Sequence, residues 1–198
     1  MVTISNVKVY DLRESIIACR NAKRITPPDY SDPEEFENSL IRAVKLAKLP
    51  SNSGHPNFLT GIRVAFDIKY PGYFTPQLQR YHFLDIVTSS SKMHRIAQIV
   101  ESEAFTEYTD PRAIAITKEL AEKYKARPSY KNLITLLSTC PQGIELFMRC
   151  DTNYMQLRTI YKQRKHDRLK EDWGAFLKFI EELPYFNELI NPEEEDEK

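Results

Sequence analysis

The sequence contains few glycines, and they never cluster. Its five glycines are Gly54, Gly61, Gly72, Gly143 and Gly174. Isolated glycines exclude the G-x-G-x-x-G turn of dinucleotide-binding folds and the G-x-x-x-x-G-K loop of phosphate-binding folds. Any nucleotide or cofactor must therefore be held by side chains and helix ends.

Cysteine and long apolar runs are also scarce. Cys19, Cys140 and Cys150 form no C-x-x-C pair, and residues 1–12 carry no secretory signal pattern. These features predict reduced thiols in a cytoplasmic protein. No apolar run approaches the roughly 20 residues of a membrane span. Histidine, cysteine and acidic residues never adopt metal-ligand spacing, so we expect neither a membrane association nor a metal site.

Neither sign of charge is in excess. The 198 residues include 28 basic and 28 acidic side chains, which gives a formal net charge of zero. This balance argues against a general nucleic-acid-binding protein but leaves room for a local anion site. A hydrophobic content of 41% is sufficient for a core. We therefore expect one domain over residues 1–186, followed by a disordered acidic tail, residues 187–198.

Hydrophobic periodicity predicts strands and helices in mixed order. Strands are expected at residues 7–11, 62–70 and 144–150, and a serine-rich turn at 88–92. Helices are expected at 14–23, 33–49, 75–84, 93–100, 111–125, 129–137, 153–168 and 173–183. This order indicates an α+β (or α/β) domain with a central mixed sheet flanked by helices.

The predicted helix at 153–168 carries an unusual face. At about 100° per residue, one arc roughly 100° wide contains both apolar and polar side chains. Its members are Asn153, Leu157, Ile160, Tyr161, Arg164 and Arg168. Arginines on a core-facing stripe suggest an anionic or planar ligand, because arginine is rarely buried without a partner. The simpler alternative is a helix with snorkelling arginines and ordinary ion pairs.

The sequence contains two blocks of polar residues with defined spacings. The first contains Gly54-His55, then Lys69-Tyr70-Pro71, then Gln77 and Arg80-Tyr81-His82, then Ser90-Ser91-Lys92. The second contains Pro141, Asn153, Leu157, Arg164 and Arg168. Over roughly residues 50–95 and 137–183, the intervals within each block resemble those of the flavin-dependent thymidylate synthases without a gap.

The resemblance implies a fold, a reaction and an assembly. The family transfers a one-carbon unit from methylene-tetrahydrofolate to C5 of dUMP. It uses FAD, which NADPH reduces, and it binds this FAD at the interfaces of a homotetramer. No cysteine attacks the pyrimidine, so the scattered cysteines are compatible with the reaction. A thymidylate synthase-like fold and methyltransferase activity in nucleotide biosynthesis are therefore the expectation.

The resemblance also implies roles for individual residues. The residues expected at the cofactor are His55, Arg80, Tyr81, His82, Asn153 and Arg168. The residues expected at the nucleotide are Gln77, Ser90, Ser91, Lys92 and Arg164. Arg164 is the expected catalytic residue, because a guanidinium beside the pyrimidine stabilises negative charge that develops on the ring.

Several positions depart from the family pattern. The Arg-His-Arg motif is Arg80-Tyr81-His82 here, the Asn-Glu pair is Val87-Thr88, and the arginine of Ser-x-Arg is Lys92. Lysine retains the charge but loses the bidentate geometry. A further family arginine is Leu137. Because flavin contacts persist better than phosphate contacts, the acceptor could be dUMP or a related nucleotide. The alternative is a flavin-binding or catalytically degenerate protein that acts on another ligand or in assembly.

Overall fold

An antiparallel four-stranded sheet forms the centre of the computed structural model, which describes residues 1–192. The strands are β1 (Thr3–Tyr10), β2 (Arg63–Pro71), β3 (Asp85–Ser89) and β4 (Glu145–Asn153), in the spatial order β1-β2-β4-β3. Each neighbouring pair is antiparallel. The predicted α+β class is confirmed, although the sheet is antiparallel throughout rather than mixed.

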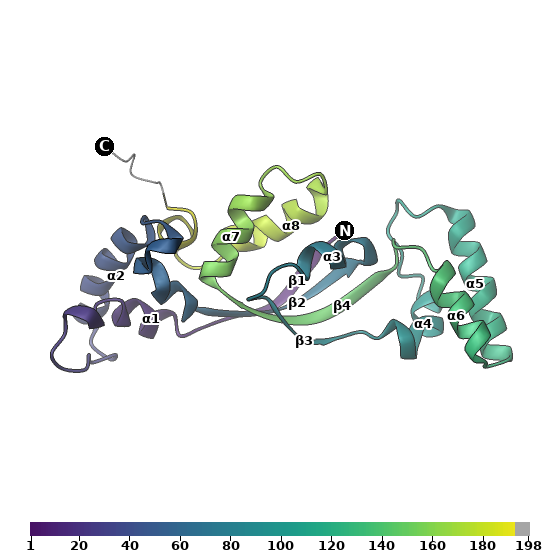
Figure 1. Cartoon of the computed structure of the whole chain (residues 1–198), viewed down its shortest axis with the longest axis horizontal. Helices are drawn as coiled ribbons and strands as arrows, with labels where there is room; N and C mark the ends of the chain where they lie inside the picture. The colour runs from purple at the N-terminus through teal and green to yellow at the C-terminus, as the bar shows by residue number, and fades with distance from the viewer. Residues whose placement is uncertain (193–198) are drawn as a thin grey trace.

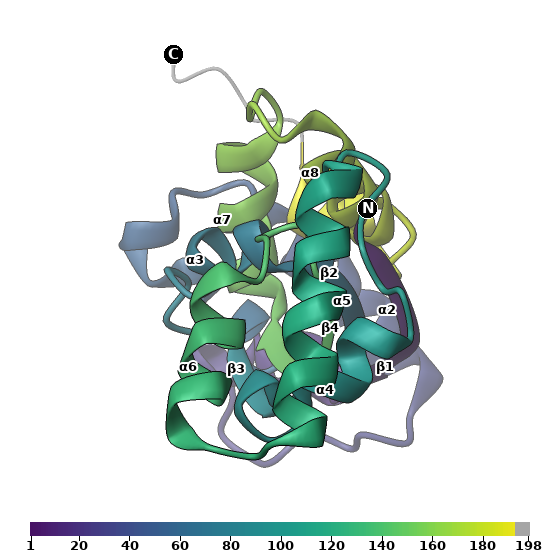
Figure 2. The same cartoon turned by 90° about the vertical axis from the view of Figure 1, so that its right-hand side faces the viewer.

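The helices fall into three groups along the molecule (Figure 1). At one end lie α1 (Leu12–Ala18), α2 (Pro33–Ala47) and the 3₁₀ turns η1 (Asn21–Lys23), η2 (Ser51–Ser53) and η3 (His55–Thr60). Over one face of the sheet lie η4 (Gly72–Phe74), α3 (Thr75–Leu78), α7 (Tyr154–Arg164) and α8 (Lys170–Glu181). At the other end stand α4 (Lys92–Glu101), α5 (Pro111–Ala126) and α6 (Tyr130–Thr139), seen together in Figure 2.

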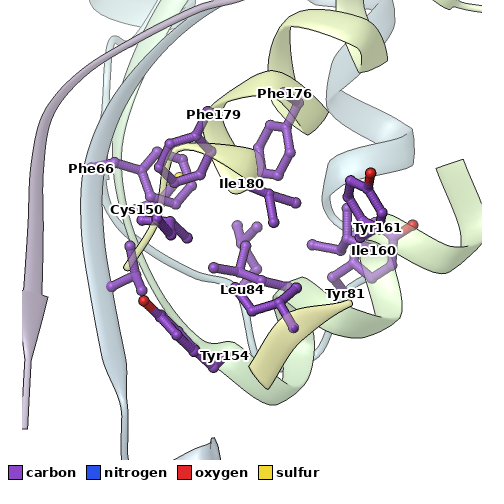
Figure 3. Packing of buried hydrophobic residues seen from close by; sticks show 14 of the residues in the cluster. Phe66, Tyr81, Leu84, Cys150, Tyr154, Ile160, Tyr161, Phe176, Phe179 and Ile180 are labelled. Carbon is purple, nitrogen blue, oxygen red and sulfur yellow. The ribbon is translucent and has the colours of Figure 1, made fainter. Parts of the chain in front are cut away.

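The main core lies between the sheet and helices α7 and α8. Alternation along β2 buries Val64, Phe66 and Ile68 completely, because successive side chains of a strand point to opposite faces. Figure 3 shows Phe66 and Cys150 of the sheet packed against Phe176 and Phe179 of α8. The rings of Phe66 and Phe179 lie 4.9 Å apart between centroids.

Helices α4–α6 enclose a second, smaller core. Its buried members are Ile96, Ala97, Val100, Ala121, Leu136 and Ile144. Ile144 lies immediately before β4 and forms an isolated bridge with Phe105, which ties the three helices to the end of the sheet. The phenol of Tyr108 adds a hydrogen bond to Glu171 on α8 at 2.8 Å.

Side-chain caps explain where most helices begin. Asp32 accepts a hydrogen bond from the backbone N–H of Glu34 at 2.9 Å, and Pro33 occupies the first turn of α2. The caps at Ser91, Asp110, Ser129 and Asn153 work in the same way. Each satisfies a backbone donor that the first turn leaves without an intrahelical partner.

The strand expected at 7–11 is β1 at residues 3–10, and the helix expected at 14–23 is divided into α1 and η1. Four further expectations also differ from the structure. The helix expected at 75–84 is the single turn α3, and the turn expected at 88–92 overlaps strand β3 and the start of α4. Helix α7 ends at Arg164, so Arg168 lies in the following loop and does not share the helical arc. The expected domain boundary at residue 186 falls within the short π-helix η5 (Phe186–Ile190), where Leu189 and Ile190 are fully buried. Residues 193–198 of the predicted tail lie outside the described part.

Residues 1–192 contain neither a helix suited to crossing a membrane nor a cluster of side chains suited to a metal ion. None of the helices there is both long enough and apolar enough to cross a membrane. The same residues contain no group of three or more histidine, cysteine, aspartate or glutamate side chains that could hold a metal ion.

Candidate functional site

The last turn of α7 places Arg164 within a cluster of aromatic and polar side chains. Its Nε donates to the Tyr81 hydroxyl at 2.6 Å, and its Nη1 donates to Asp167 at 2.6 Å and to Gln77 at 3.3 Å. The guanidinium carbon lies 4.5 Å from the centre of the Trp173 ring. These contacts fix the guanidinium, and its remaining nitrogen, Nη2, makes no hydrogen bond among the described residues.

Burial and hydrogen bonding set the protonation states of this cluster. Burial lowers the pKa of Arg164, but hydrogen bonds to Asp167 and Tyr81 outweigh it and raise the pKa overall. Burial raises the pKa of the Tyr81 phenol, and the adjacent Arg164 only partly opposes this shift. Asp167 has a lowered pKa: burial favours its neutral form, but hydrogen bonds from the Leu169 N–H and Arg164 outweigh it. The cluster therefore contains a cation and a carboxylate at neutral pH.

Trp173, on α8, contacts both Arg164 and Gln77 in this cluster. Its indole is 1% exposed and its Nε1 donates to the Gln77 side chain at 2.6 Å. The apolar spacing of Trp173, Phe176, Phe179 and Ile180 in the sequence predicts that Trp173 is a core residue, which is confirmed. The spacing gives no sign of its contact with Arg164. Asp167 was also not predicted. Asp167 lies three residues beyond the last residue of α7, so helical spacing alone does not indicate that it meets Arg164.

The Arg80-Tyr81-His82 motif lies in the turn between α3 and β3. Arg80 and His82 are exposed, and neither makes a hydrogen bond or ion pair among the described residues. Tyr81 is only 7% exposed and packs at the edge of the Trp173 ring. Figure 3 shows Tyr81 beside Ile160 and Tyr161 at one side of the buried cluster. Tyr81 is thus positioned to hold Arg164 rather than to present its ring to solvent.

Ser90, Ser91 and Lys92 connect β3 to α4. Ser90 exchanges two hydrogen bonds with the backbone of Phe147 on β4, at 2.8 and 3.1 Å. Ser91 caps α4 by accepting from the His94 N–H at 3.3 Å. Lys92, which is half-buried, begins the helix. Both serines therefore have structural roles, and the first turn of α4 is basic.

Gly54 and His55 lie at the opposite end of the sheet. Gly54 has φ +76°, a left-handed conformation that glycine adopts without strain, and it turns the chain into η3. Exposed His55 follows and lines a cleft of about 980 Å³ between α1, α2 and η3. Asn153, at the nearby end of β4, caps α7 by accepting from the Gln156 N–H at 2.9 Å. Arg168 is exposed in the loop after α7.

The cleft beside His55 is rich in positive charge. Lys23, Arg42 and Lys45 line it, and none of their side chains makes a hydrogen bond or ion pair within residues 1–192. Two more arginines of the lining, Arg20 and Arg24, pair with Glu35. Sequence reasoning missed these cations because they are divided between η1, with its flanking residues, and α2, which are separate in the sequence. The cleft is suited to a large anionic ligand.

One chain brings only some of the predicted site residues together. Arg164, Gln77 and Tyr81 are in direct contact, whereas His55 faces the cleft, and Ser90, Ser91 and Lys92 lie at the start of α4. Chemically, the Arg164 cluster can stabilise negative charge on a neighbouring planar group. The cleft can hold phosphates.

Comparisons with known proteins find likeness at the level of the fold. No family model matches the chain, and no curated protein matches it. A crystal structure of Thymidylate Synthase X (ThyX) from Helicobacter pylori with FAD and dUMP matches with a TM-score of 0.63 and 12% identity. The match covers 96% of this chain and 95% of that chain.

A second solved structure gives a similar match. The UMP/dUMP methylase PolB from Streptomyces cacaoi, bound with 5-Br dUMP, matches with a TM-score of 0.63 and 12% identity, over 96% of this chain and 91% of that one. The chain therefore has a ThyX-like fold, which confirms the predicted fold. Identity this low leaves the activity to be argued from the site.

Proposed function

We propose that this protein transfers a one-carbon unit to C5 of a pyrimidine nucleotide, dUMP or a related one, in a flavin-dependent reaction of the thymidylate synthase type. The observation that carries the proposal is Arg164, fixed by three acceptors and an indole ring within a fold shared with ThyX and PolB. A guanidinium held in this way stabilises developing charge without reorganising.

FAD is the proposed cofactor, and the cleft beside His55 supports this choice. Its volume of about 980 Å³ lies at the upper end of ordinary ligand pockets, about 300–1,000 Å³. Lys23, Arg42 and Lys45 supply cations for a pyrophosphate, and their side chains have no ion-pair partner among residues 1–192. Exposed Arg80, His82 and Arg168 would add contacts. FAD would supply the redox chemistry, with NADPH as reductant and methylene-tetrahydrofolate as one-carbon donor.

The nucleotide would lie against Arg164 and Gln77. Arg164 would face the pyrimidine ring and stabilise the negative charge that builds on it. Lys92 and the N–H groups at the start of α4 would hold the phosphate, because a helix N-terminus favours anions. Ser90 and Ser91 would shape this loop through the backbone bonds that they make.

A homotetramer is the proposed assembly, because the site residues are dispersed over one chain. His55 lies at one end of the sheet, whereas Lys92 begins the helical group at the other. Copies packed through the sheet face opposite α7 and α8 could bring these groups together. That face carries Phe147, which is 65% exposed.

The second candidate function is ligand binding by a protein that has lost catalysis. The burial of Tyr81 favours this alternative. Tyr81 belongs to the motif expected at the cofactor, but its hydroxyl instead accepts a hydrogen bond from Arg164 inside the protein. Under this alternative FAD or a nucleotide binds, but no methylated product forms.

The test begins with the colour of the purified protein. We expect a yellow protein that releases FAD on denaturation, oxidises NADPH faster with dUMP or UMP, and forms a methylated nucleotide detectable by mass spectrometry. Colourless protein that cannot be reconstituted with FAD contradicts the proposal. Bound FAD without stimulation by any pyrimidine nucleotide supports the degenerate alternative.

The Arg164→Ala variant tests the proposed catalytic role of this residue directly. We expect product formation to fall by about 10²–10³-fold while FAD remains bound, which is the usual cost of removing one electrostatic contact to the transition state. Arg112→Ala, at an exposed ion pair on α5, is the matched control and should leave turnover unchanged. Unaltered turnover in Arg164→Ala would refute the catalytic assignment.

A further inference from the structure

Asp172 is a buried carboxylate at the start of α8, and the proposed reaction assigns it no role. The residue is only 3% exposed. One carboxylate oxygen accepts from the backbone N–H of Val2 at 3.0 Å, and the other accepts from the Tyr73 hydroxyl at 2.9 Å. No cation pairs with Asp172 among the described residues. Its negative charge is therefore stabilised by these two donors and by the N-terminus of α8, in whose first turn it lies.

Tyr73, on η4, is a donor that stays protonated. Burial raises the pKa of its phenol, and the hydrogen bond to Asp172 raises it further. The backbone N–H of Tyr73 donates to the carbonyl oxygen of Gln142 at 3.0 Å, just before β4 begins. Val2, the other donor, directly precedes β1. Asp172 thus joins the first turn of α8 to chain segments beside two strands of the sheet.

The segment that carries Tyr73 meets α8 at a second hydrogen bond. Gln77 follows Tyr73 by four residues in the continuous run of η4 and α3, and Trp173 directly follows Asp172 on α8. The indole Nε1 of Trp173 donates to the Gln77 side chain at 2.6 Å. Arg164 contacts both partners of this bond, since its guanidinium donates to Gln77 at 3.3 Å and lies 4.5 Å from the centre of the indole ring.

We propose that Asp172 is a positioning residue that acts on Arg164 through its bond to Tyr73. This bond sets the spacing between the η4–α3 segment and α8, and the spacing keeps Gln77 and Trp173 against the guanidinium. The inference rests on the proposed function, because the position of the guanidinium affects turnover only if Arg164 faces the nucleotide. Removal of the Tyr73 hydroxyl leaves a buried carboxylate oxygen without a donor, which is costly. The first turn of α8 then shifts toward another donor and moves Trp173 with it.

The indole of Trp173 gives a direct readout of this spacing. Trp173 is the only tryptophan of the sequence, so its indole N–H gives a single NMR resonance that needs no cofactor, substrate or turnover. Tyr73→Phe keeps the ring and removes only the hydroxyl. We expect the resonance to shift in this variant, and the indole N–H to exchange with water about tenfold faster, in keeping with one buried polar group left unsatisfied. Asp172→Asn should act in the same direction, because it removes one of the two acceptors.

Turnover of dUMP by the FAD-reconstituted protein gives the second readout. A small displacement of a group that stabilises the transition state lowers kcat, whereas KM reports mainly on binding in the ground state. We expect Tyr73→Phe to lower kcat by about tenfold or more, because even small misplacements from a distant substitution are costly. The KM for dUMP should change much less than kcat.

Tyr108→Phe is the matched control. The phenol of Tyr108 donates to Glu171, in the same turn of α8, at 2.8 Å, so this variant loses the same kind of bond one residue earlier. It should leave the indole resonance and kcat as in the wild type, and effects equal to those of Tyr73→Phe would contradict the inference. An unchanged resonance in both Tyr73→Phe and Asp172→Asn overturns it, as does a shifted resonance with unchanged kcat. A wild type without turnover overturns the proposed function, and the indole resonance then decides alone whether Asp172 positions this cluster.

Discussion

Asp167 is the residue that joins the end of α7 to the start of α8. One carboxylate oxygen accepts from Arg164 at 2.6 Å and the other accepts from the Leu169 N–H at 3.0 Å. Both bonds are stronger to the ionised form, and together they outweigh the effect of burial and lower the pKa of Asp167. A carboxyl group whose pKa is lower in the folded than in the unfolded chain stabilises the fold when it is ionised.

Asp167→Asn should therefore change how stability depends on pH. The stabilisation from Asp167 is complete above the pKa of an unfolded aspartate, about 3.9, and is lost as pH falls through the lower folded value. Urea unfolding from pH 7 down to pH 3 should show a constant gap in unfolding free energy between wild type and variant above about pH 5. The gap should close as pH falls below about 4. Parallel curves over the whole range would contradict this prediction.

Residue-level prediction from the sequence was partly successful. The arc of the 153–168 helix correctly predicts that Leu157, Ile160 and Tyr161 are buried together. It also places Arg164 on this face, with an anionic or planar ligand as the suggested partner. The charge partner within the chain is instead Asp167, which lies beyond the end of the helix, where helical geometry no longer applies.

At the scale of elements, Asn153 combines two potential roles at the start of α7. Its side-chain oxygen caps the helix by accepting from the Gln156 N–H. Its amide nitrogen makes no hydrogen bond among the described residues, which leaves a donor for the proposed cofactor. Asparagine is among the best N-cap residues, and aspartate caps equally well but has no amide donor.

Two substitutions separate these roles. Asn153→Ala should lower the free energy of unfolding by about 1 kcal/mol, measured by urea denaturation, because the cap is lost. Asn153→Asp should retain wild-type stability and yet bind FAD several-fold more weakly in a fluorescence titration of the flavin. Equal stability of Asn153→Ala and the wild type would argue against the cap. Unchanged FAD affinity in Asn153→Asp would remove Asn153 from the cofactor site.

Elements with local signals were predicted well, and elements that depend on tertiary contacts were not. Asp32-Pro33 and Asp110-Pro111 contain both a cap and an N1 proline, so the starts of α2 and α5 follow from a few residues. Strand β3 has every residue exposed and so lacks the alternation of a half-buried strand. Its partner β4 lies more than 50 residues away, and no local pattern encodes that pairing. Helix α3 stops after one turn while Tyr81 packs on Trp173, a contact that spacing cannot reveal.

At the scale of the whole molecule, the sheet has two unlike faces. One packs its β4 side chains Leu146, Met148 and Cys150 into the main core. On the other face, Arg149 forms an ion pair with Asp67, and Arg63 forms one with Asp151. The exposed ring of Phe147 lies on this same face. Protein interfaces commonly have an apolar centre and a polar rim. An exposed aromatic ring with ion pairs around it on the same sheet face has this arrangement.

Phe147→Asp tests whether copies of the chain associate through this face. If the homotetramer forms here, the substitution places a carboxylate in the apolar centre, and the variant should elute as a smaller species in size-exclusion chromatography with light scattering. Its FAD content and turnover should fall together with assembly, because the proposed site needs residues from more than one copy.

Ile116→Asp is the matched control: Ile116 is 50% exposed on α5, away from the sheet. A Phe147→Asp protein that retains both its mass and its FAD would move the interface elsewhere, whereas loss of assembly with FAD retained would place the cofactor within a single chain.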